Sequence, residues 1–204
     1  MEDIRITLPK EVSNLQLPDP ELRNYYVDLE DRVFWIDSEI TPFLLELSRY
    51  ILRWNKDDSK TPVEKRKPIR ILIFSPGGDL ETYRSVSDII QLSKTPVIGI
   101  NMGMAYSAAA MIFLSCHVRY MLPSASVLFH KGSSHMSGSF NEVCSAMYEY
   151  QQQVEELSHI IAQKTTYTID EIEENMNGDW YIRAPEALEH GICHKVIEDI
   201  GELI

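Results

Sequence analysis

The chain is poor in cysteine and has no cluster of metal-binding residues. Its 204 residues include three cysteines, Cys116, Cys144 and Cys193, and none of them forms a C-x-x-C pair. An odd number without such pairing argues against a disulfide framework and favours reduced thiols, which are typical of a cytosol. No group of histidines and cysteines has the spacing of a metal site. We therefore expect a cytoplasmic protein that binds no metal.

A basic surplus and long apolar runs are also missing. The 31 acidic residues outnumber the 19 basic ones and give a formal net charge of -12, whereas binding to nucleic acids or anionic membranes needs a basic surface. No segment reaches the roughly 18 apolar residues of a membrane helix, and residues 1–20 contain no apolar stretch of the signal-peptide kind. We expect a soluble globular protein with neither nucleic acid nor membrane as a partner.

Segments with strand character alternate with segments of helix character along most of the chain. Several of the strand segments are almost wholly apolar, which suits strands that are covered on both faces. This alternation predicts an α/β fold in which helices pack on parallel strands. We expect strands at residues 32–36, 69–74, 96–100, 126–130, 180–182 and 193–197, and helices at 41–54, 79–93, 107–114 and 140–164, with two shorter ones after Thr168 and before Gly191.

Proline, charge and glycine punctuate this pattern. Residues 1–31 include Pro18 and Pro20 and are expected to form an extended N-terminal arm, followed by a single domain over residues 32–204. Residues 55–68 are charged and contain proline, so we expect a solvated loop there. Gly103 is expected to end the third strand.

The longest expected helix, residues 140–164, carries a narrow apolar stripe with heptad-like spacing. One interpretation is that this stripe packs against helices of the same subunit. The other is that the helix projects as a handle and meets another subunit. Periodicity alone favours neither. The stripe consists of Val143, Met147, Tyr150, Val154, Leu157 and Ile161.

Three features with chemical potential each follow an apolar strand. The glycine pair in residues 75–78 (SPGG) allows close backbone approach to a ligand, although it can also be a simple tight turn. Ser107 stands between a strand and a helix, where it can be a nucleophile or a common N-cap. His130 ends a strand and can be a general base or a hydrogen-bonded core residue. None of these features is decisive alone.

Taken in order, these segments resemble the proteolytic subunit of the Clp protease, a serine peptidase, from about Arg32 to Ile197. The resemblance begins with the strand that ends in SPGG and a G-x-x-x-S segment at 103–107. A Leu-Pro pair, three residues, three apolar residues and a histidine follow at 122–130. The long helix resembles the handle of this family. The last segment, at 179–191, starts with aspartate before an aromatic residue and ends in glycine.

The resemblance implies a role for each residue that matches the family motifs. Ser107 corresponds to the nucleophile, His130 to the general base, and Asp179 to the residue that orients this base. The backbone N–H groups of Gly78 and Ala108 correspond to the oxyanion hole.

Two places depart from the family pattern. Lys131 and Gly132 stand where the family has Gln-Pro, in the segment that corresponds to the substrate-binding strand. Asn177 and Gly178 replace a charged Asp-Arg or Glu-Arg pair that helps to join two rings. The charged segment 55–67 is longer than usual in the family, and the residues before Arg32 match the family's axial gate poorly.

The family implies a ClpP/crotonase-like fold with a projecting handle helix. It also implies hydrolysis of unfolded polypeptides and short peptides through an acyl-enzyme that needs no cofactor. The expected assembly is a heptameric ring, with two stacked rings forming a tetradecameric chamber and an AAA+ unfoldase as a possible partner. Two alternatives are an acyl-CoA-handling protein on the crotonase fold and a non-catalytic ring subunit that needs an active paralogue. The acyl-CoA chemistry would not require Ser107, His130 and Asp179 together.

Overall fold

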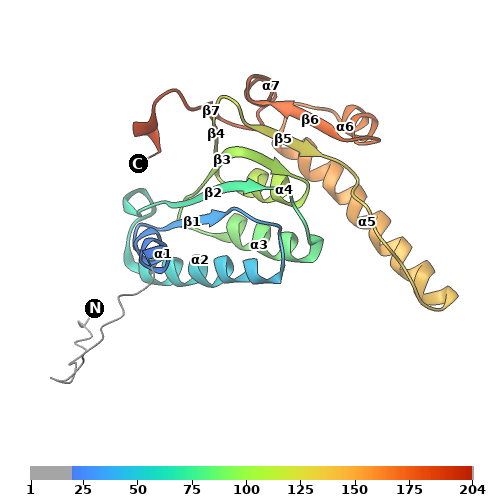
Figure 1. The fold of residues 1–204 in the computed structure, drawn as a ribbon, viewed down its shortest axis with the longest axis horizontal. Coiled ribbons are helices and arrows are strands. Elements are labelled where there is room, and N and C mark those ends of the chain that lie inside the picture. The colour runs from blue at the N-terminus through green and yellow to red at the C-terminus, as the bar shows by residue number, and fades with distance from the viewer. Residues whose placement is uncertain (1–19, 204) are drawn as a thin grey trace.

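A computed structural model describes residues 20–203, which fold around one seven-stranded sheet (Figure 1). The strand order is β1-β2-β3-β4-β7. In addition, β5 pairs with β3, and β6 pairs with the other side of β5. All pairs are parallel except β5 with β6, so the expected α/β fold with parallel strands is confirmed. The strands are β1 (Val33–Ile36), β2 (Ile69–Ser75), β3 (Val97–Tyr106), β4 (Val118–Met121), β5 (Ser126–Phe129), β6 (Trp180–Arg183) and β7 (Lys195–Val196).

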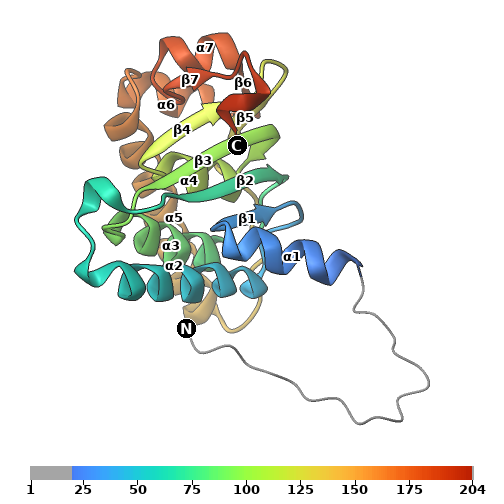
Figure 2. The same ribbon diagram turned by 90° about the vertical axis from the view of Figure 1, so that its left-hand side faces the viewer.

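Helices cover the sheet, and one of them leaves the body of the molecule. In Figures 1 and 2, α2 and α3 lie side by side along one face of the sheet, and α5 extends away from it. Short 3-10 turns occupy residues 42–44, 58–60, 63–65 and 200–202. The helices are α1 (Pro20–Glu30), α2 (Leu45–Asp57), α3 (Leu80–Leu92), α4 (Ala108–Ser115), α5 (Phe140–Lys164), α6 (Ile169–Asn175) and α7 (Ala184–Glu189).

The core lies between the sheet and its helices. In β2, alternate residues Ile69, Ile71 and Ile73 are fully buried, as expected for the covered face of a strand. Every residue of α4 is buried, because this helix packs on β3 and is also contacted by α3 and α5. A helix that is apolar on all sides is stable in such a central position and nowhere on the surface.

The expectation that Gly103 ends a strand is wrong. β3 continues through this glycine to Tyr106 and changes partner, since its first half pairs with β4 and its last residues pair with β5. A Cβ atom at Gly103 would lie 2.9 Å from the Phe74 ring, so the glycine allows close packing. The Asn101 side chain lies where β3 changes from one neighbouring strand to the other. It accepts a hydrogen bond from the Gly103 N–H at 3.0 Å and donates one to the Ser126 carbonyl at 2.8 Å.

Part of the expected extended arm is helical. Residues 20–30 form α1, which contacts β1, and Trp35 Nε1 donates a hydrogen bond to Asp28 at 3.2 Å. A proline at the first helical position has no N–H to lose and a suitable φ, so Pro20 can begin this helix. The remainder of the arm, residues 1–19, lies outside the described part of the chain. The loop expected from residue 55 begins later, because α2 continues to Asp57.

The long helix has the predicted bounds, Phe140–Lys164, and its apolar stripe divides into two parts. Leu157 and Ile161 are buried in the core of the same subunit, with 6% and 0% of their surface exposed. Towards the other end, Met147 is 64% exposed, and the helix projects beyond the body (Figure 1). Internal packing therefore explains only the C-terminal part of the stripe.

A largely buried ion pair fixes the charged segment that follows α2. Arg32 donates to both carboxylate oxygens of Asp58 at 2.6 and 2.9 Å, and Thr95 Oγ1 donates to the same group at 2.9 Å. The hydrogen bond from Arg32 is the main reason why the pKa of Asp58 is lowered. Arg32 has a left-handed backbone with φ of 59°, a strained conformation that surrounding contacts must hold in place. The pair thus joins the start of β1 to the segment before β2.

We predict that Asp58→Asn lowers the free energy of unfolding by about 2–3 kcal/mol, because it leaves the Arg32 charge almost buried without its counter-ion. Since folding lowers the pKa of Asp58, its stabilising effect is present above the unfolded-state pKa and is lost as the pH falls through the folded-state value. Urea unfolding at neutral pH and near pH 3 should therefore show a mutant–wild-type difference that shrinks in acid. The exposed neighbour provides the control Asp57→Asn, and an equal loss in that variant would contradict the prediction.

Candidate active site

Ser107 occupies a sharp turn between β3 and α4. Its φ of 54° and ψ of -124° are unusual for a residue other than glycine, and such strain persists only where neighbouring structure enforces it. Here the Ser107 N–H donates to the Leu128 carbonyl at 2.9 Å, and the Ser107 carbonyl accepts from the N–H of Ala110 at the same distance. The turn therefore holds the hydroxyl at the N-terminus of a buried helix, where developing negative charge is favoured.

The antiparallel pair β5–β6 brings His130 next to Asp179. Phe129 is paired with Trp180 at the end of this ladder, and their rings lie 5.8 Å apart. The next residue on each strand lies just beyond the ladder, and His130 Nδ1 is 3.2 Å from Asp179 Oδ1. Residues 49 positions apart in the chain are thus set side by side by backbone pairing.

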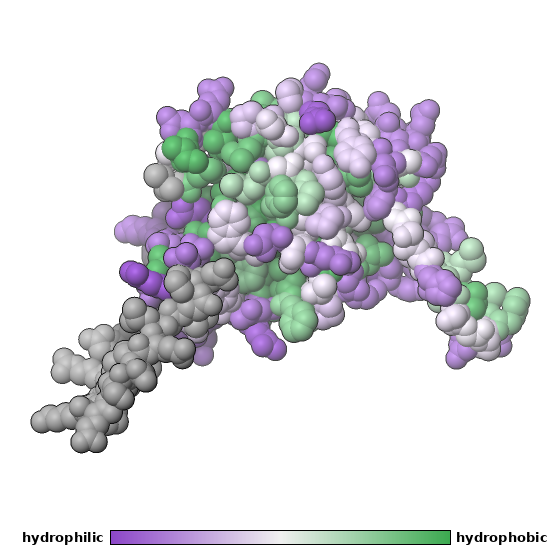
Figure 3. All heavy atoms as spheres, viewed as in Figure 1, coloured by the Kyte–Doolittle hydropathy of each residue, from purple (hydrophilic) through white to green (hydrophobic). Residues whose placement is uncertain are grey.

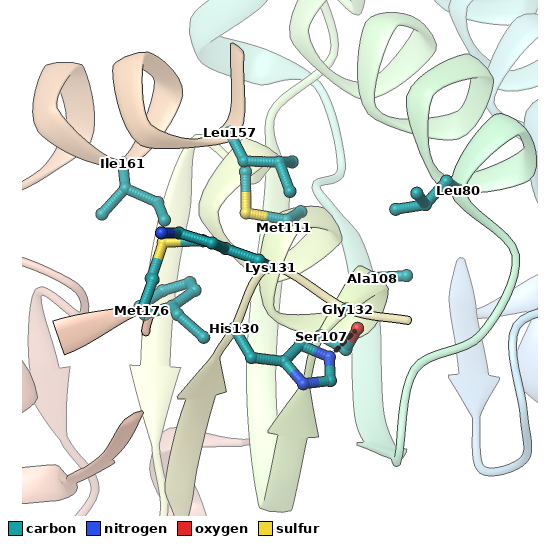
Figure 4. A pocket seen from close by; sticks show the side chains of 11 residues that line it. Leu80, Ser107, Ala108, Met111, His130, Lys131, Gly132, Leu157, Ile161 and Met176 are labelled. Carbon is teal, nitrogen blue, oxygen red and sulfur yellow. Dashed lines mark hydrogen bonds between the residues drawn. The ribbon is translucent and has the colours of Figure 1, made fainter. Parts of the chain in front are cut away.

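The other imidazole nitrogen faces the serine. His130 Nε2 is 2.8 Å from Ser107 Oγ, and Figure 4 shows the ring directed at the hydroxyl. The parallel pairing of Tyr106 with Leu128 creates this contact, because it places the ends of β3 and β5 together. The structure therefore brings Ser107, His130 and Asp179 into one continuous hydrogen-bonded row, with the imidazole in the middle. Such a row can transfer the hydroxyl proton to the imidazole.

The SPGG turn packs directly against Ser107. The Ser75 hydroxyl donates to the Ser38 carbonyl at 2.6 Å and accepts from the Gly77 N–H at 3.2 Å. A Cβ atom at Gly77, whose φ is 98°, would lie 2.5 Å from the Tyr106 carbonyl oxygen and 2.7 Å from Ser107 Cβ. Only glycine allows so close an approach with this backbone.

The two expected oxyanion-hole donors lie on the segments that flank the serine. Gly78 follows the glycine that touches Ser107, and it forms an isolated parallel bridge with Ile40. The bridge uses the Gly77 carbonyl and the Asp79 N–H rather than the Gly78 N–H. Ala108 is the first residue of α4, a position whose N–H has no acceptor within the helix. The Gly78 N–H is therefore not used by the bridge and the Ala108 N–H not by the helix, and their role as an oxyanion hole stays a prediction.

A small, mainly apolar cavity adjoins the hydroxyl and the imidazole (Figure 4). Its walls come from β5, α4, the inner end of α5 and the residue after α6, which are distant in the chain. With a volume of about 20 Å³, the cavity has room for only a small group, and its lining favours an apolar one. The apolar lining residues are Leu80, Met111, Phe129, Leu157, Ile161 and Met176.

The expected substrate strand at Lys131 and Gly132 is not a strand of this structure. β5 ends at Phe129, and Gly132 has a φ of 78°, which is not extended. The Lys131 carbonyl accepts a hydrogen bond from the Tyr150 hydroxyl at 2.7 Å, and Lys131 Nζ donates to Asn177 Oδ1 at 2.6 Å. No pattern in the sequence indicates these contacts, because they depend on where α5 and the segment before β6 lie. A role in substrate binding stays a prediction.

Within residues 20–203, no group of three or more His, Cys, Asp and Glu side chains could hold a metal ion. Over the same residues, no helix has the length and apolar character needed to cross a lipid bilayer.

Comparison with known proteins identifies the family. The family model described as Clp protease matches residues 61–200. The chain belongs to the Clp protease family. ATP-dependent Clp protease proteolytic subunit 2 of Treponema pallidum is 31% identical over 139 residues, which cover 67% of this chain and 70% of that protein. The ATP-dependent Clp protease proteolytic subunit of Paracoccus denitrificans is 30% identical with the same coverage.

A solved member of the family has the same fold. The structure of a ClpP1 mutant from Listeria monocytogenes matches with a TM-score of 0.75 and 24% sequence identity, covering 89% of this chain and 99% of that one. Both the resemblance seen in the sequence and the expected fold are thereby confirmed. Membership of the Clp protease family implies a serine protease, which agrees with the chemistry that Ser107 and His130 can perform.

We predict that Gly77→Ala lowers peptide hydrolysis by about a hundredfold, because the new methyl group must displace either the SPGG turn or the strained serine turn. The contacts that it would make are with backbone and with Cβ of Ser107, which cannot rotate away. Activity on a fluorogenic peptide measures the loss, and circular dichroism checks that the variant is folded. A folded variant with wild-type activity would show that the close contact is dispensable.

Proposed function

We propose that the chain is a serine endopeptidase subunit in which Ser107 is the nucleophile, His130 the general base and Asp179 the residue that orients His130. The single observation that carries this proposal is the 2.8 Å contact of His130 Nε2 with Ser107 Oγ. A serine hydroxyl is a weak nucleophile at neutral pH and needs such a base. The 3.2 Å contact of the same imidazole with Asp179 supplies the third group of a triad.

The reaction would proceed through an acyl-enzyme. Ser107 Oγ attacks the scissile carbonyl carbon while His130 Nε2 takes the hydroxyl proton, and the N–H groups of Gly78 and Ala108 stabilise the oxyanion. His130 then gives the proton to the leaving amine, and a water molecule activated by the same imidazole hydrolyses the ester. Asp179 stays ionised and holds the imidazole in the productive tautomer. None of these steps needs a metal or a cofactor.

The substrates we propose are unfolded polypeptides and short peptides with an apolar side chain next to the cleaved bond. The cavity beside Ser107 is small and has mainly apolar walls, which favour a small apolar side chain over a charged one. An extended peptide can also offer its backbone to protein N–H and C=O groups, which gives affinity without sequence preference. An acyl-CoA-handling role is less well supported, since that chemistry does not need the contacts between Ser107, His130 and Asp179.

We further propose that the subunit works inside a chamber built from heptameric rings, two of them stacked through the handle α5. The projecting half of α5 supports this assembly, because an apolar surface on a lone helix costs roughly 25 cal/mol for each Å² left in water. Figure 3 shows apolar side chains gathered at the free end of the helix, where Phe140 is 82% exposed. An AAA+ unfoldase would deliver folded substrates, as the term ATP-dependent in the names of the relatives suggests.

We predict that Ser107→Ala lowers peptide hydrolysis by about a thousandfold or more without unfolding the protein, because it removes the nucleophilic oxygen alone. A fluorophosphonate probe should label the wild-type protein at Ser107 and leave this variant unlabelled. The exposed serine in the turn before β5 gives the matched control, Ser124→Ala, which should keep full activity. Turnover by folded Ser107→Ala at the wild-type rate would refute the proposed peptidase mechanism.

The handle assembly can be tested on residues that are not part of the subunit core. We predict that Val143→Glu with Met147→Glu reduces the native mass of the particle and its peptidase activity together, since two charges would enter an apolar contact between subunits. Sedimentation velocity reports the mass. The control places two charges on the opposite face of the helix, as Ser145→Glu with Gln152→Glu. An unchanged mass in the first double variant would contradict assembly through α5.

A further inference from the structure

Lys131 and Asn177 lie next to the proposed triad and contact each other. Lys131 directly follows His130, and Asn177 precedes Asp179 by two residues. The Lys131 ammonium group donates a hydrogen bond to Asn177 Oδ1 at 2.6 Å. The two segments that carry the base and its orienting carboxylate are therefore joined twice, once by His130 with Asp179 and once by this second pair.

The segment that carries Asp179 is held otherwise by long backbone hydrogen bonds, from the Asn177 N–H to the Glu174 carbonyl at 3.3 Å and from the Gly178 N–H to the Asn175 carbonyl at 3.4 Å. The β5–β6 ladder ends at Phe129 with Trp180, so both His130 and Asp179 lie beyond the last paired residues. The Asp179 side chain is 61% exposed, and its contact with His130 is 3.2 Å long. A Cβ atom at Gly178 would meet nothing within 4 Å, so packing does not restrain this glycine. Water and backbone motion would both compete with the contact to His130.

We propose that the hydrogen bond from Lys131 to Asn177 is a positioning contact that holds Asp179 against His130 in the reactive geometry. The inference rests on the proposed triad and adds two residues whose mutual contact acts on the Asp179 segment and not on the reacting atoms. In this arrangement the hydrogen bond joins the two chain segments just beyond the last backbone pair of β5 and β6, Phe129 with Trp180. It limits how far the segment from Asn177 to Asp179 can move away from the imidazole.

The handle helix fixes the lysine from the other side. The Tyr150 hydroxyl on α5 donates to the Lys131 carbonyl at 2.7 Å. Partial burial raises the pKa of Tyr150, so the hydroxyl keeps its proton at neutral pH and can act as this donor. Figure 4 shows the Lys131 side chain extending away from Ser107, so its ammonium group acts on the Asp179 segment and not on the serine. Tyr150, Lys131 and Asn177 thus connect α5 to the triad within one subunit.

The experiment compares the removal of each partner with its conservative replacement in the full-length assembled protein. Lys131→Met keeps the apolar stem and removes the ammonium group, and Asn177→Leu removes the acceptor with little change in shape. We expect each to lower kcat for a fluorogenic peptide roughly tenfold with KM almost unchanged, because a misplaced base slows chemistry and not binding. Lys131→Arg and Asn177→Asp retain a donor and an acceptor and should restore most of kcat.

A double variant and a distant control complete the test. Lys131→Met with Asn177→Leu should be no slower than either single variant, since the second change removes a bond that is already lost. Lys94→Met, which removes an exposed lysine far from the site, should behave as wild type. Asp179→Asn, measured alongside, gives the loss expected when the third triad member itself is changed.

Several results would overturn the inference while leaving the peptidase proposal intact. These are wild-type kcat in Lys131→Met, multiplicative losses in the double variant, or a rise in KM at constant kcat, which would make Lys131 a substrate-binding residue. A fall in native mass that accompanies the loss of kcat would likewise show that the pair acts through assembly. Failure of the peptidase proposal has a different signature, namely turnover that survives in Ser107→Ala.

Discussion

The position of β5 between two other strands is the constraint on which the rest of the site depends. β5 pairs with β3 in parallel and with β6 in antiparallel fashion. The parallel pair sets the end of β5 beside Ser107, and the antiparallel pair sets it beside Asp179. His130 directly follows β5, so its imidazole can contact both groups. A one-residue shift of either register would break one of the two hydrogen bonds, since side chains alternate between the faces of a sheet.

The serine itself depends on strained backbone that the core supports. A residue with a positive φ at Ser107 costs of order 1–3 kcal/mol, and the fully buried α4 together with the Gly77 contact keeps it there. The same rigidity does not extend to Asp179, which lies on an exposed segment. The site therefore combines a rigidly held Ser107 hydroxyl with an exposed carboxylate that contacts His130, and Tyr150 of α5 contacts Lys131, the residue after this histidine. If the proposed triad is correct, this contact would connect the handle helix to its geometry.

Much of the fold could be predicted from the sequence because its signals are local. The apolar runs, the capping box at Thr168 and the heptad-like stripe of residues 140–164 depend on neighbours within a few positions, and the structure has the expected elements there. The errors occurred where a distant contact decides the outcome. Gly103 continues its strand because Phe74 packs on it and β5 takes over the pairing. β4 (Val118–Met121) was missed, since its short, mixed segment is a strand only because β3 and β7 lie on either side.

The sequence by itself determined the family, the alternating fold and the identity of Ser107, His130 and Asp179 as candidate residues. This was possible because ordered motifs and hydrophobic periodicity depend only on the order of residues in the chain. Only the tertiary structure decided that these three side chains meet, that Gly77 must lie against the serine, and that Lys131 contacts Asn177. The physical reason is that such contacts arise from strand register and helix packing between segments far apart in sequence. Their distances follow from the folded backbone and from no local pattern of residues.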